Sequence, residues 1–265
     1  MYFQLFVACS VFLELEFCMA IVERGKETKG LDLYYYNATS IRGKLLDFNN
    51  FFTSHDHEII CVTETWLNSA VHDGEILDNI KHTIHRKDRD LERTKKKDGG
   101  GTLCAVSNNL RSSRRYDFEN DDLEMLWVEI SMPNKGIFVG TVYLPPGFKL
   151  ETLALLDSSI ELALSSMNEF DHLVIVGDIN CRDIQWSYDA NDQLIVSNPD
   201  ELSSISSRFI EVLDCHNLSQ FNSNVTCNNA VLDLVITDGA QAVCNTTDNA
   251  TTSTHHALDV NIDIP

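Results

Sequence analysis

Polar residues of the kinds that serve in hydrolysis follow several apolar segments of strand length: Asn37, Glu64, Tyr143, Asp178 and Asn180. Side chains at strand ends can converge on one sheet edge although they are far apart in the sequence. A carboxylate there could bind a hard divalent cation such as Mg²⁺. The other groups, with a histidine, could orient water and stabilise the charge that develops on a phosphoryl group.

Each of these residues also has a purely structural explanation. Asn37 could cap a helix that begins near Ile41, and Glu64 could be an exposed acid beside the core aromatic Trp66. The segment Gly177-Asp178-Ile179-Asn180 is more informative, because Asp and Asn at alternate positions after a buried strand point to one side. A simple turn would explain this segment as well.

Asp233 lies in an apolar strand with leucine on both sides, and a carboxylate in that position needs a polar partner. A histidine is suitable, and the chain offers His255 and His256 near its C-terminus. Apolar and polar residues alternate over 258–264, which fixes the inward face of a last strand. This alternation does not decide between a chemical histidine and a surface turn.

Eight segments have the length and the β-branched and aromatic composition of strands. They are residues 31–36, 58–63, 102–107, 123–132, 136–144, 172–177, 231–237 and 257–264. Apolar residues recur at helical spacing over 41–52, 153–167 and 202–212. Strands and helices alternate only loosely, which favours an α/β fold of two packed mixed sheets with helices outside over a doubly wound sheet or a barrel.

The 265-residue chain is long enough for one substantial domain, and 43% of its residues are hydrophobic. Its formal net charge of −20 argues against a protein that coats nucleic acid or an anionic membrane without specificity. Positive charge is concentrated between residues 81 and 115, which contain eleven Lys or Arg and four Asp or Glu. Residues 81–98 show no clear periodicity and end in Gly99-Gly100-Gly101, which predicts a loop.

We interpret residues 1–30 as a leader, mostly apolar over residues 1–22, and residues 31–265 as the domain. Glu14 and Glu16 interrupt the apolar run, so it would make a poor membrane span. We therefore expect no membrane association and an intracellular location, nuclear or cytoplasmic. A signal peptide cleaved after Ala20 is the alternative, although no basic residue precedes the apolar run.

Taken in order, the motifs of residues 31–264 resemble the endonuclease domain of non-LTR retrotransposons, in the endonuclease/exonuclease/phosphatase superfamily that also contains apurinic/apyrimidinic endonucleases. The motifs are Asn37-Ala38-Thr39-Ser40-Ile41, Glu64-Thr65-Trp66-Leu67, Arg86-Lys87-Asp88-Arg89 followed by Gly99-Gly100-Gly101, Val142-Tyr143-Leu144-Pro145-Pro146, Gly177-Asp178-Ile179-Asn180, Leu232-Asp233-Leu234-Val235 and a terminal Ser-x-His.

The resemblance implies a four-layer, DNase I-like α/β sandwich and hydrolysis of a DNA phosphodiester that depends on Mg²⁺, or on Mn²⁺. By analogy, Glu64 would hold the metal with support from Asn37, and Asp178 would position or activate the attacking water. The resemblance also implies roles at the phosphate for Asn180, Tyr143 and His255, the last oriented by Asp233. Basic residues of the predicted loop would face DNA: Arg86, Arg89, Lys95, Lys96 and Lys97.

The chain departs from the family at its C-terminal motif, which usually reads Ser-Asp-His. Aligning the apolar face of the last strand places Ser253-Thr254-His255 there, so Thr254 replaces the acid that assists the metal site. In the other register His256 is the site histidine and His255 takes the acidic position, where imidazole is a poor ligand for Mg²⁺. Either register predicts an impaired metal site.

Two further departures would weaken DNA contact. Cys227 stands where many relatives carry arginine, and Leu144 replaces an arginine often found after the tyrosine. The chain has no reverse transcriptase domain, so we interpret it as a lone endonuclease module. The open alternatives are a phosphatase of the same superfamily acting on phosphomonoesters or lipid headgroups, and a catalytically dead fold or binding module.

Overall fold

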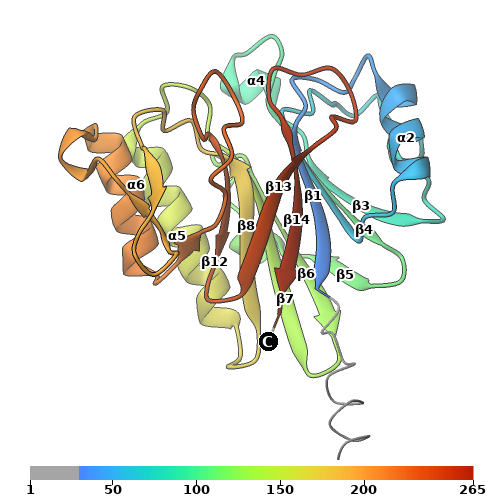
Figure 1. Ribbon diagram of the computed structural model, residues 1–265. Coiled ribbons are helices and arrows are strands. Elements are labelled where there is room, and N and C mark those ends of the chain that lie inside the picture. The colour runs from blue at the N-terminus through green and yellow to red at the C-terminus, as the bar shows by residue number, and fades with distance from the viewer. Residues whose placement is uncertain (1–29, 265) are drawn as a thin grey trace, which may run out of the picture.

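Two six-stranded β-sheets pack face to face in residues 30–264, the part of the chain that the computed structural model describes (Figure 1). The first sheet contains, in spatial order, β13 (Gln241–Thr247), β14 (Ala257–Asp263), β1 (Leu31–Asn37), β2 (Ile59–Thr63), β4 (Thr102–Ser107) and β3 (His82–Lys87). The second contains β11 (Ser219–Gln220), β12 (Asp233–Thr237), β8 (His172–Asp178), β7 (Lys135–Tyr143), β6 (Met125–Met132) and β5 (Arg111–Arg114). Strands β9 (Trp186–Tyr188) and β10 (Leu194–Val196) pair with each other outside both sheets.

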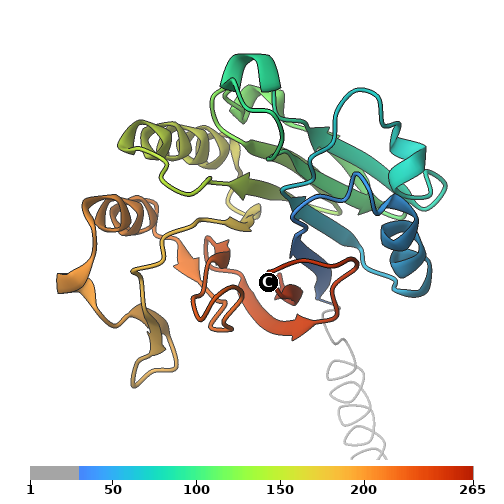
Figure 2. The same ribbon diagram turned by 90° about the horizontal axis from the view of Figure 1, so that it is seen from above.

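Helices cover the outer faces of both sheets. Helix α2 (Leu45–Ser54) packs on the first sheet, and α5 (Leu150–Ser166) and α6 (Ser204–Cys215) pack on the second (Figures 1 and 2). The loops contain the short helices α3 (Asp73–Ile76) and α4 (Leu91–Thr94) and the 3₁₀ turns η1 (Tyr116–Phe118) and η2 (Pro199–Glu201). This arrangement confirms the predicted four-layer α/β sandwich.

Apolar side chains fill the three spaces between these four layers. Tyr35 of β1 and Val176 of β8 are buried between the two sheets. Tyr34 points to the opposite face of β1 and meets Phe52 of α2 edge-on, with ring centroids 5.0 Å apart. Under α5, Trp127 of β6 donates its indole N–H to Ser159 over 2.9 Å. Because β1 and β8 are buried on both faces, their ends form a rigid support for polar side chains.

Two parallel strand pairs bring the ends of four strands to one end of the molecule. β1 and β2 are parallel and joined through α2, and β7 and β8 are parallel and joined through α5. Their registers pair Asn37 with Thr63 and Tyr143 with Asp178. β12 runs antiparallel to β8, so Asp233 at its start lies opposite Asp178 at the end of β8.

All eight predicted strands and all three predicted helices form, but the edge strands were not predicted. The loop expected at residues 81–98 is wrong in part, because β3 occupies His82–Lys87 and α4 occupies Leu91–Thr94. β3 pairs only with β4, and most of its side chains are partly exposed, so it lacks the apolar periodicity of a buried strand. β13, at the opposite edge of the same sheet, is polar for the same reason.

Residues 1–29 and 265 lie outside the described part of the chain, and with them most of the predicted leader and its candidate cleavage site at Ala20. The boundary between leader and domain remains a prediction. Within residues 30–264, every helix is too short or too polar to cross a lipid bilayer.

Candidate active site

The two buried aspartates of the site belong to neighbouring strands of the second sheet. Asp178 ends β8, Asp233 begins β12, and both side chains are almost completely buried. Burial, together with the nearby charge of Asp233, holds the pKa of Asp178 well above its usual range. Two like charges in one buried pocket are costly, and such a pair is typical of a site built for proton or cation chemistry.

Asp178 is held by donors from two other segments. The side-chain amide of Asn37, at the end of β1, donates to Asp178 Oδ2 over 2.8 Å, and this bond crosses from the first sheet to the second. The backbone N–H of Asn180 donates to Asp178 Oδ1 over 3.1 Å. Both carboxylate oxygens therefore have fixed directions, and Asn37 does not cap a helix.

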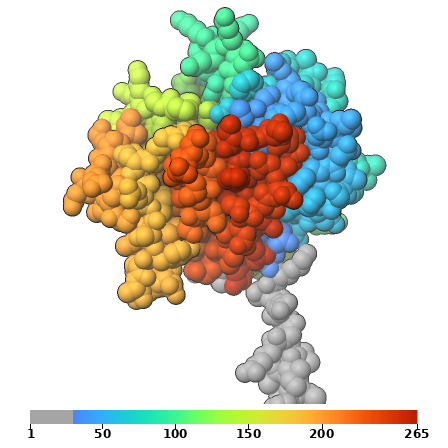
Figure 3. Space-filling view, turned by 45° about the horizontal axis from the view of Figure 1, so that its top comes forward, coloured from blue at the N-terminus to red at the C-terminus, as the bar shows by residue number. Residues whose placement is uncertain are grey.

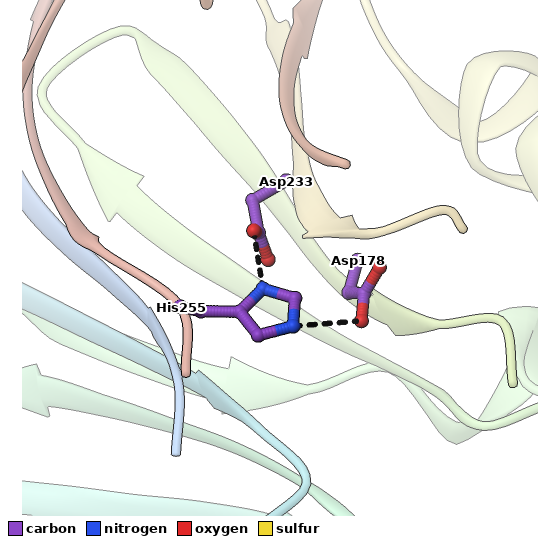
Figure 4. A group of neighbouring side chains, drawn as sticks. All are labelled: Asp178, Asp233 and His255. Carbon is purple, nitrogen blue, oxygen red and sulfur yellow. Dashed lines mark hydrogen bonds and ion pairs between the residues drawn. The ribbon is translucent and has the colours of Figure 1, made fainter. Parts of the chain in front are cut away.

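His255 lies between the two aspartates (Figure 4). Its Nδ1 is 2.6 Å from Asp233 Oδ2, and its Nε2 is 4.0 Å from Asp178 Oδ2. Burial opposes a charge on this imidazole, but the hydrogen bond and charge of Asp233, with the charges of Asp178 and Glu64, raise the pKa of His255 above its usual value. Nε2 therefore faces Asp178, and it can donate a hydrogen bond when the imidazole is charged.

Asp233 is itself oriented by buried donors. The phenol of Tyr35 donates to Asp233 Oδ1 over 2.8 Å, and burial followed by the charge of Asp233 raises the pKa of Tyr35, so this phenol stays protonated. The hydroxyl of Thr226 accepts the backbone N–H of Asp233 over 3.2 Å. Neither residue was predicted from the sequence, because Tyr35 resembles its core neighbours and Thr226 lies in a polar loop.

The loop before β14 selects one of the two histidines. The Ser253 hydroxyl donates to the Asn37 carbonyl over 2.7 Å and accepts the backbone N–H of His255 over 3.1 Å. This places His255 in the pocket, whereas His256 is exposed and its backbone N–H donates to the carbonyl of Thr226 over 2.9 Å. In the space-filling view, this C-terminal loop lies beside the segment that follows β1 (Figure 3).

Glu64 follows β2 in a strained segment. Glu64 and Trp66 have φ of 52° and 56°, which bulky residues rarely adopt. The Trp66 indole N–H donates to Glu64 Oε2 over 2.9 Å. Such strain persists only where the surrounding structure enforces it, and it is common at functional sites. Glu64 is predicted as a site residue from the sequence, whereas Trp66 is predicted only as a core aromatic and its hydrogen bond to Glu64 is not.

Tyr143 and Asn180 complete the set of strand-end residues. Burial, followed by the charge and hydrogen bonding of Glu64, raises the pKa of Tyr143, which stays a neutral donor beside that carboxylate. Asn180 has φ of 55°, and its side-chain amide donates to the carbonyl of Leu144 over 2.9 Å. This bond ties the loop after β8 to the loop after β7.

The oxygen donors near Glu64 suit a hard divalent cation. The Glu64 carboxylate is partly exposed, and the Asn37 side-chain oxygen accepts only the N–H of Thr39, over 3.1 Å, among the described residues. Asp178, Asp233 and His255 also offer ligand atoms within 4.8 Å of one another. In that group the short bond between His255 and Asp233 indicates a hydrogen-bonded pair rather than two ligands, so the carboxylates are the better candidates.

The predicted DNA-facing residues fall into two groups. The Arg86 guanidinium contacts Asp88 over 2.7 Å and Asp73 over 3.2 Å, and that of Arg89 contacts Glu124 over 2.5 Å. Their side chains are 14% and 9% exposed, so both arginines are engaged within the protein. Lys95, Lys96 and Lys97, after α4, are exposed.

Solved structures with this fold include both nucleases and phosphatases. The endonuclease domain of TRAS1, a telomere-specific non-LTR retrotransposon, superposes with a TM-score of 0.63 and 11% identity over 88% of this chain and 98% of that one. AP endonuclease LMAP from Leishmania major gives 0.65 and 15% over 92% of this chain and 90% of that one. Mannosyl-6-phosphatase Bt3783 from Bacteroides thetaiotaomicron gives 0.56 and 12% over 88% and 99%.

These likenesses establish the DNase I-like fold of two mixed sheets flanked by helices, as the resemblance implies. Residues 137–259 match the family described as endonuclease-reverse transcriptase, which confirms the resemblance to retrotransposon endonucleases. The matched segment contains Tyr143, Asp178, Asn180, Asp233 and His255. A search of the curated proteins finds no match.

Proposed function

We propose that this protein is a divalent-metal-dependent endonuclease that nicks DNA. The observation that carries the proposal is the buried hydrogen-bonded chain from Tyr35 through Asp233 to His255, which ends 4.0 Å from an Asp178 held by Asn37. A charged imidazole donor beside a carboxylate of raised pKa suits hydrolysis of an anionic ester, which needs both a proton acceptor and stabilisation of negative charge.

Each residue has a distinct task in this proposal. Asp178 orients the attacking water and accepts its proton, since its raised pKa makes it a better base than an ordinary aspartate. His255, held by Asp233, donates from Nε2 to an oxygen of the scissile phosphate. Tyr143, at the end of β7, and Asn180, in the loop after β8, steady the same phosphate.

Glu64, assisted by Asn37, would hold Mg²⁺ or Mn²⁺. The bound cation would neutralise charge on the phosphoryl oxygens and the leaving group. Trp66 keeps the Glu64 carboxylate in one orientation for this task. Thr254 is exposed at the position where the resemblance leads us to expect an acid, so we propose that metal binding is weaker than it would be with that acid.

DNA is the proposed partner, in the nucleus or the cytoplasm. Because the whole chain carries a formal charge of −20, binding must rely on local positive charge at this end of the molecule. The exposed Lys95, Lys96 and Lys97 supply such charge. We therefore expect weak DNA association that falls steeply as salt is added.

A plasmid assay tests the proposal. Purified protein with Mg²⁺ should convert supercoiled plasmid to the nicked form, and a chelator should abolish this. Glu64→Ala and Asp178→Ala should each lower the rate about a hundredfold or more. Nicking that survives both substitutions would refute the site. Hydrolysis of phosphomonoesters without nicking would favour the phosphatase alternative, and no activity on either substrate would favour a dead fold.

The Thr254 departure has its own test. Thr254→Asp should increase nicking at limiting Mg²⁺, because a carboxylate is restored in the loop that holds His255. Thr254→Asn, which adds an amide of the same size without the charge, is the matched control. Equal activity of these two variants would show that Thr254 is not the position of a missing ligand.

A further inference from the structure

Most arginines in the described part of the chain are neutralised by carboxylates. Seven form ion pairs within 4.0 Å: Arg42, Arg86, Arg89, Arg93, Arg114, Arg115 and Arg208. Among residues 30–264, Arg111 and Arg182 form none, and both are exposed. Arg111 begins β5, at the far end of the second sheet from the candidate site. Arg182 follows Asn180 by two residues and lies at the site.

The turn that carries Arg182 is fixed to the protein body. Cys181 and Ile184 on either side are 5% and 4% exposed, and the N–H of Ile184 donates to the carbonyl of Cys181 over 3.3 Å. Asp183 accepts the N–H of Ser203 over 2.6 Å, which anchors the turn to the start of α6. The exposed arginine is therefore presented from a rigid support and not from a free loop.

The Arg182 side chain reaches the loop before β12. Burial raises the pKa of the Cys227 thiol, and the hydrogen bonding and positive charge of Arg182 oppose that shift, which places Arg182 near the loop that contains Cys227. Cys227 directly follows Thr226, whose hydroxyl accepts the N–H of Asp233. The charges of Asp233 and Asp178 also act on the Cys227 thiol. Arg182 thus stands at the edge of the acidic pocket without pairing with either acid.

An exposed guanidinium that forms no ion pair, carried by an anchored turn two residues after Asn180, is suited to an oxyanion. Its planar donors match two oxygens of one phosphate, which a lysine cannot do. In an acidic protein this charge also offsets the repulsion that a phosphodiester meets at the pocket. The resemblance implies the loss of a DNA contact at Cys227, and Arg182 offers a guanidinium from the neighbouring loop.

We propose that Arg182 binds a backbone phosphate of the DNA strand that is cut and thereby positions the scissile bond over Asp178 and His255. This inference rests on the proposed DNA-nicking function. A neutral residue at position 182 would lose one phosphate contact, which should weaken binding and lower its dependence on salt.

Binding and nicking should be measured separately for Arg182→Gln, Arg182→Lys and the control Arg111→Gln. Binding of a fluorescent DNA duplex is followed by anisotropy in chelator over a range of salt concentrations. For Arg182→Gln we expect a Kd about tenfold higher than that of the wild type. The slope of log Kd plotted against the logarithm of the salt concentration should be smaller by about 0.9, the value of one phosphate contact on duplex DNA. Arg182→Lys should restore the slope but only part of the affinity. Arg111→Gln, which removes the same charge at the far end, should match the wild type.

The same salt slope and Kd for Arg182→Gln and Arg111→Gln would overturn the inference, as would failure of the wild-type protein to bind DNA. Unchanged melting temperatures show that the variants are folded. If the wild type binds DNA but does not nick plasmid, the proposed function fails while the binding contrast at Arg182 still decides this inference. If the wild type nicks and Arg182→Gln nicks with an unchanged KM, only the inference fails.

Discussion

Charged side chains at one end of the molecule are held in two opposite ways. In the site, the like charges of Asp178 and Asp233 are buried on adjacent strands with one histidine between them. In the neighbouring basic segment, residues 86–97, the buried charges are opposite, as in the pair of Arg89 with Glu124. The two regions touch, since the Arg89 guanidinium lies 5.8 Å from the centre of the Tyr143 ring.

The difference separates charge that serves chemistry from charge that serves folding. Ionised Asp178 is disfavoured by burial and by Asp233, so its raised pKa lowers stability at neutral pH, and it suits the role of base that we propose. In the ion pair of Arg89 with Glu124, each charge is neutralised by the other, and the pair contributes to the stability of the fold. Motif residues that look equivalent in the sequence therefore have different tasks.

Asp233→Asn should have the largest effect, and it tests the role of the buried like charges in the site. An amide cannot hold His255 as an imidazolium, so we expect the nicking rate to fall about a hundredfold or more. Asp233 raises the pKa of His255, and the active charged form is lost as the pH rises through that pKa. The alkaline limb of the pH–rate profile should therefore move to lower pH in the variant.

Tyr35→Phe is the control for this change, because it removes a hydrogen bond to Asp233 but leaves the carboxylate charge. Its rate should fall about tenfold, with little shift of the alkaline limb. An equal shift in both variants would show that Asp233 does not set the charge on His255.

Arg89→Met should lower stability, and it tests whether the buried ion pair of the basic segment serves the fold. The variant keeps the apolar stem but leaves Glu124, which also accepts the N–H of Gly101 over 2.8 Å, without its guanidinium. We expect a loss of about 2 kcal/mol in the free energy of unfolding, measured with urea. Nicking per folded molecule at low temperature should stay within about threefold of the wild type.

Exposed Arg93, paired with Asp122, offers a matched control, since Arg93→Met should change stability by less than about 0.5 kcal/mol. If Arg89→Met abolished nicking without lowering stability, Arg89 would belong to the site and the division between the two regions would be wrong.

The pairing of Asp233 with a histidine could be predicted locally, because a carboxylate inside an apolar strand requires a partner. The role of Tyr35 could not be predicted, because it stands in a row of three tyrosines that all look like core residues. Only the packing of the two sheets shows that its phenol lies beside Asp233. The partner of Arg89 lies 35 residues away. Edge strands β3 and β13 lack an apolar pattern because each has only one neighbour.

Trp66→Phe tests, within the site, whether Trp66 orients the proposed metal ligand Glu64. The ring is kept, but the indole N–H that orients Glu64 is lost. Residues that orient a metal ligand typically affect metal affinity by about 10- to 100-fold, and a single neutral donor places this one at the lower end. We expect half-maximal nicking to require about tenfold more Mg²⁺, with a nearly unchanged rate at saturation. A lower rate at saturating Mg²⁺ with no change in Mg²⁺ requirement would contradict a role for Trp66 in orienting Glu64.

Changing Lys95, Lys96 and Lys97 together to glutamine should have the smallest effect and tests whether the exposed part of the basic segment faces DNA. These side chains have free access to solvent, so stability should change by less than about 0.5 kcal/mol, in contrast to Arg89→Met. Each lysine that contacts a phosphate should contribute about 0.9 to the salt slope of binding, and we expect a Kd about fivefold higher at moderate salt. Lys135→Gln combined with Arg111→Gln removes charge at the other end of the second sheet and is the control. Equal binding by these two variants would show that the lysines are a solvated surface, and the basic segment would then serve folding alone.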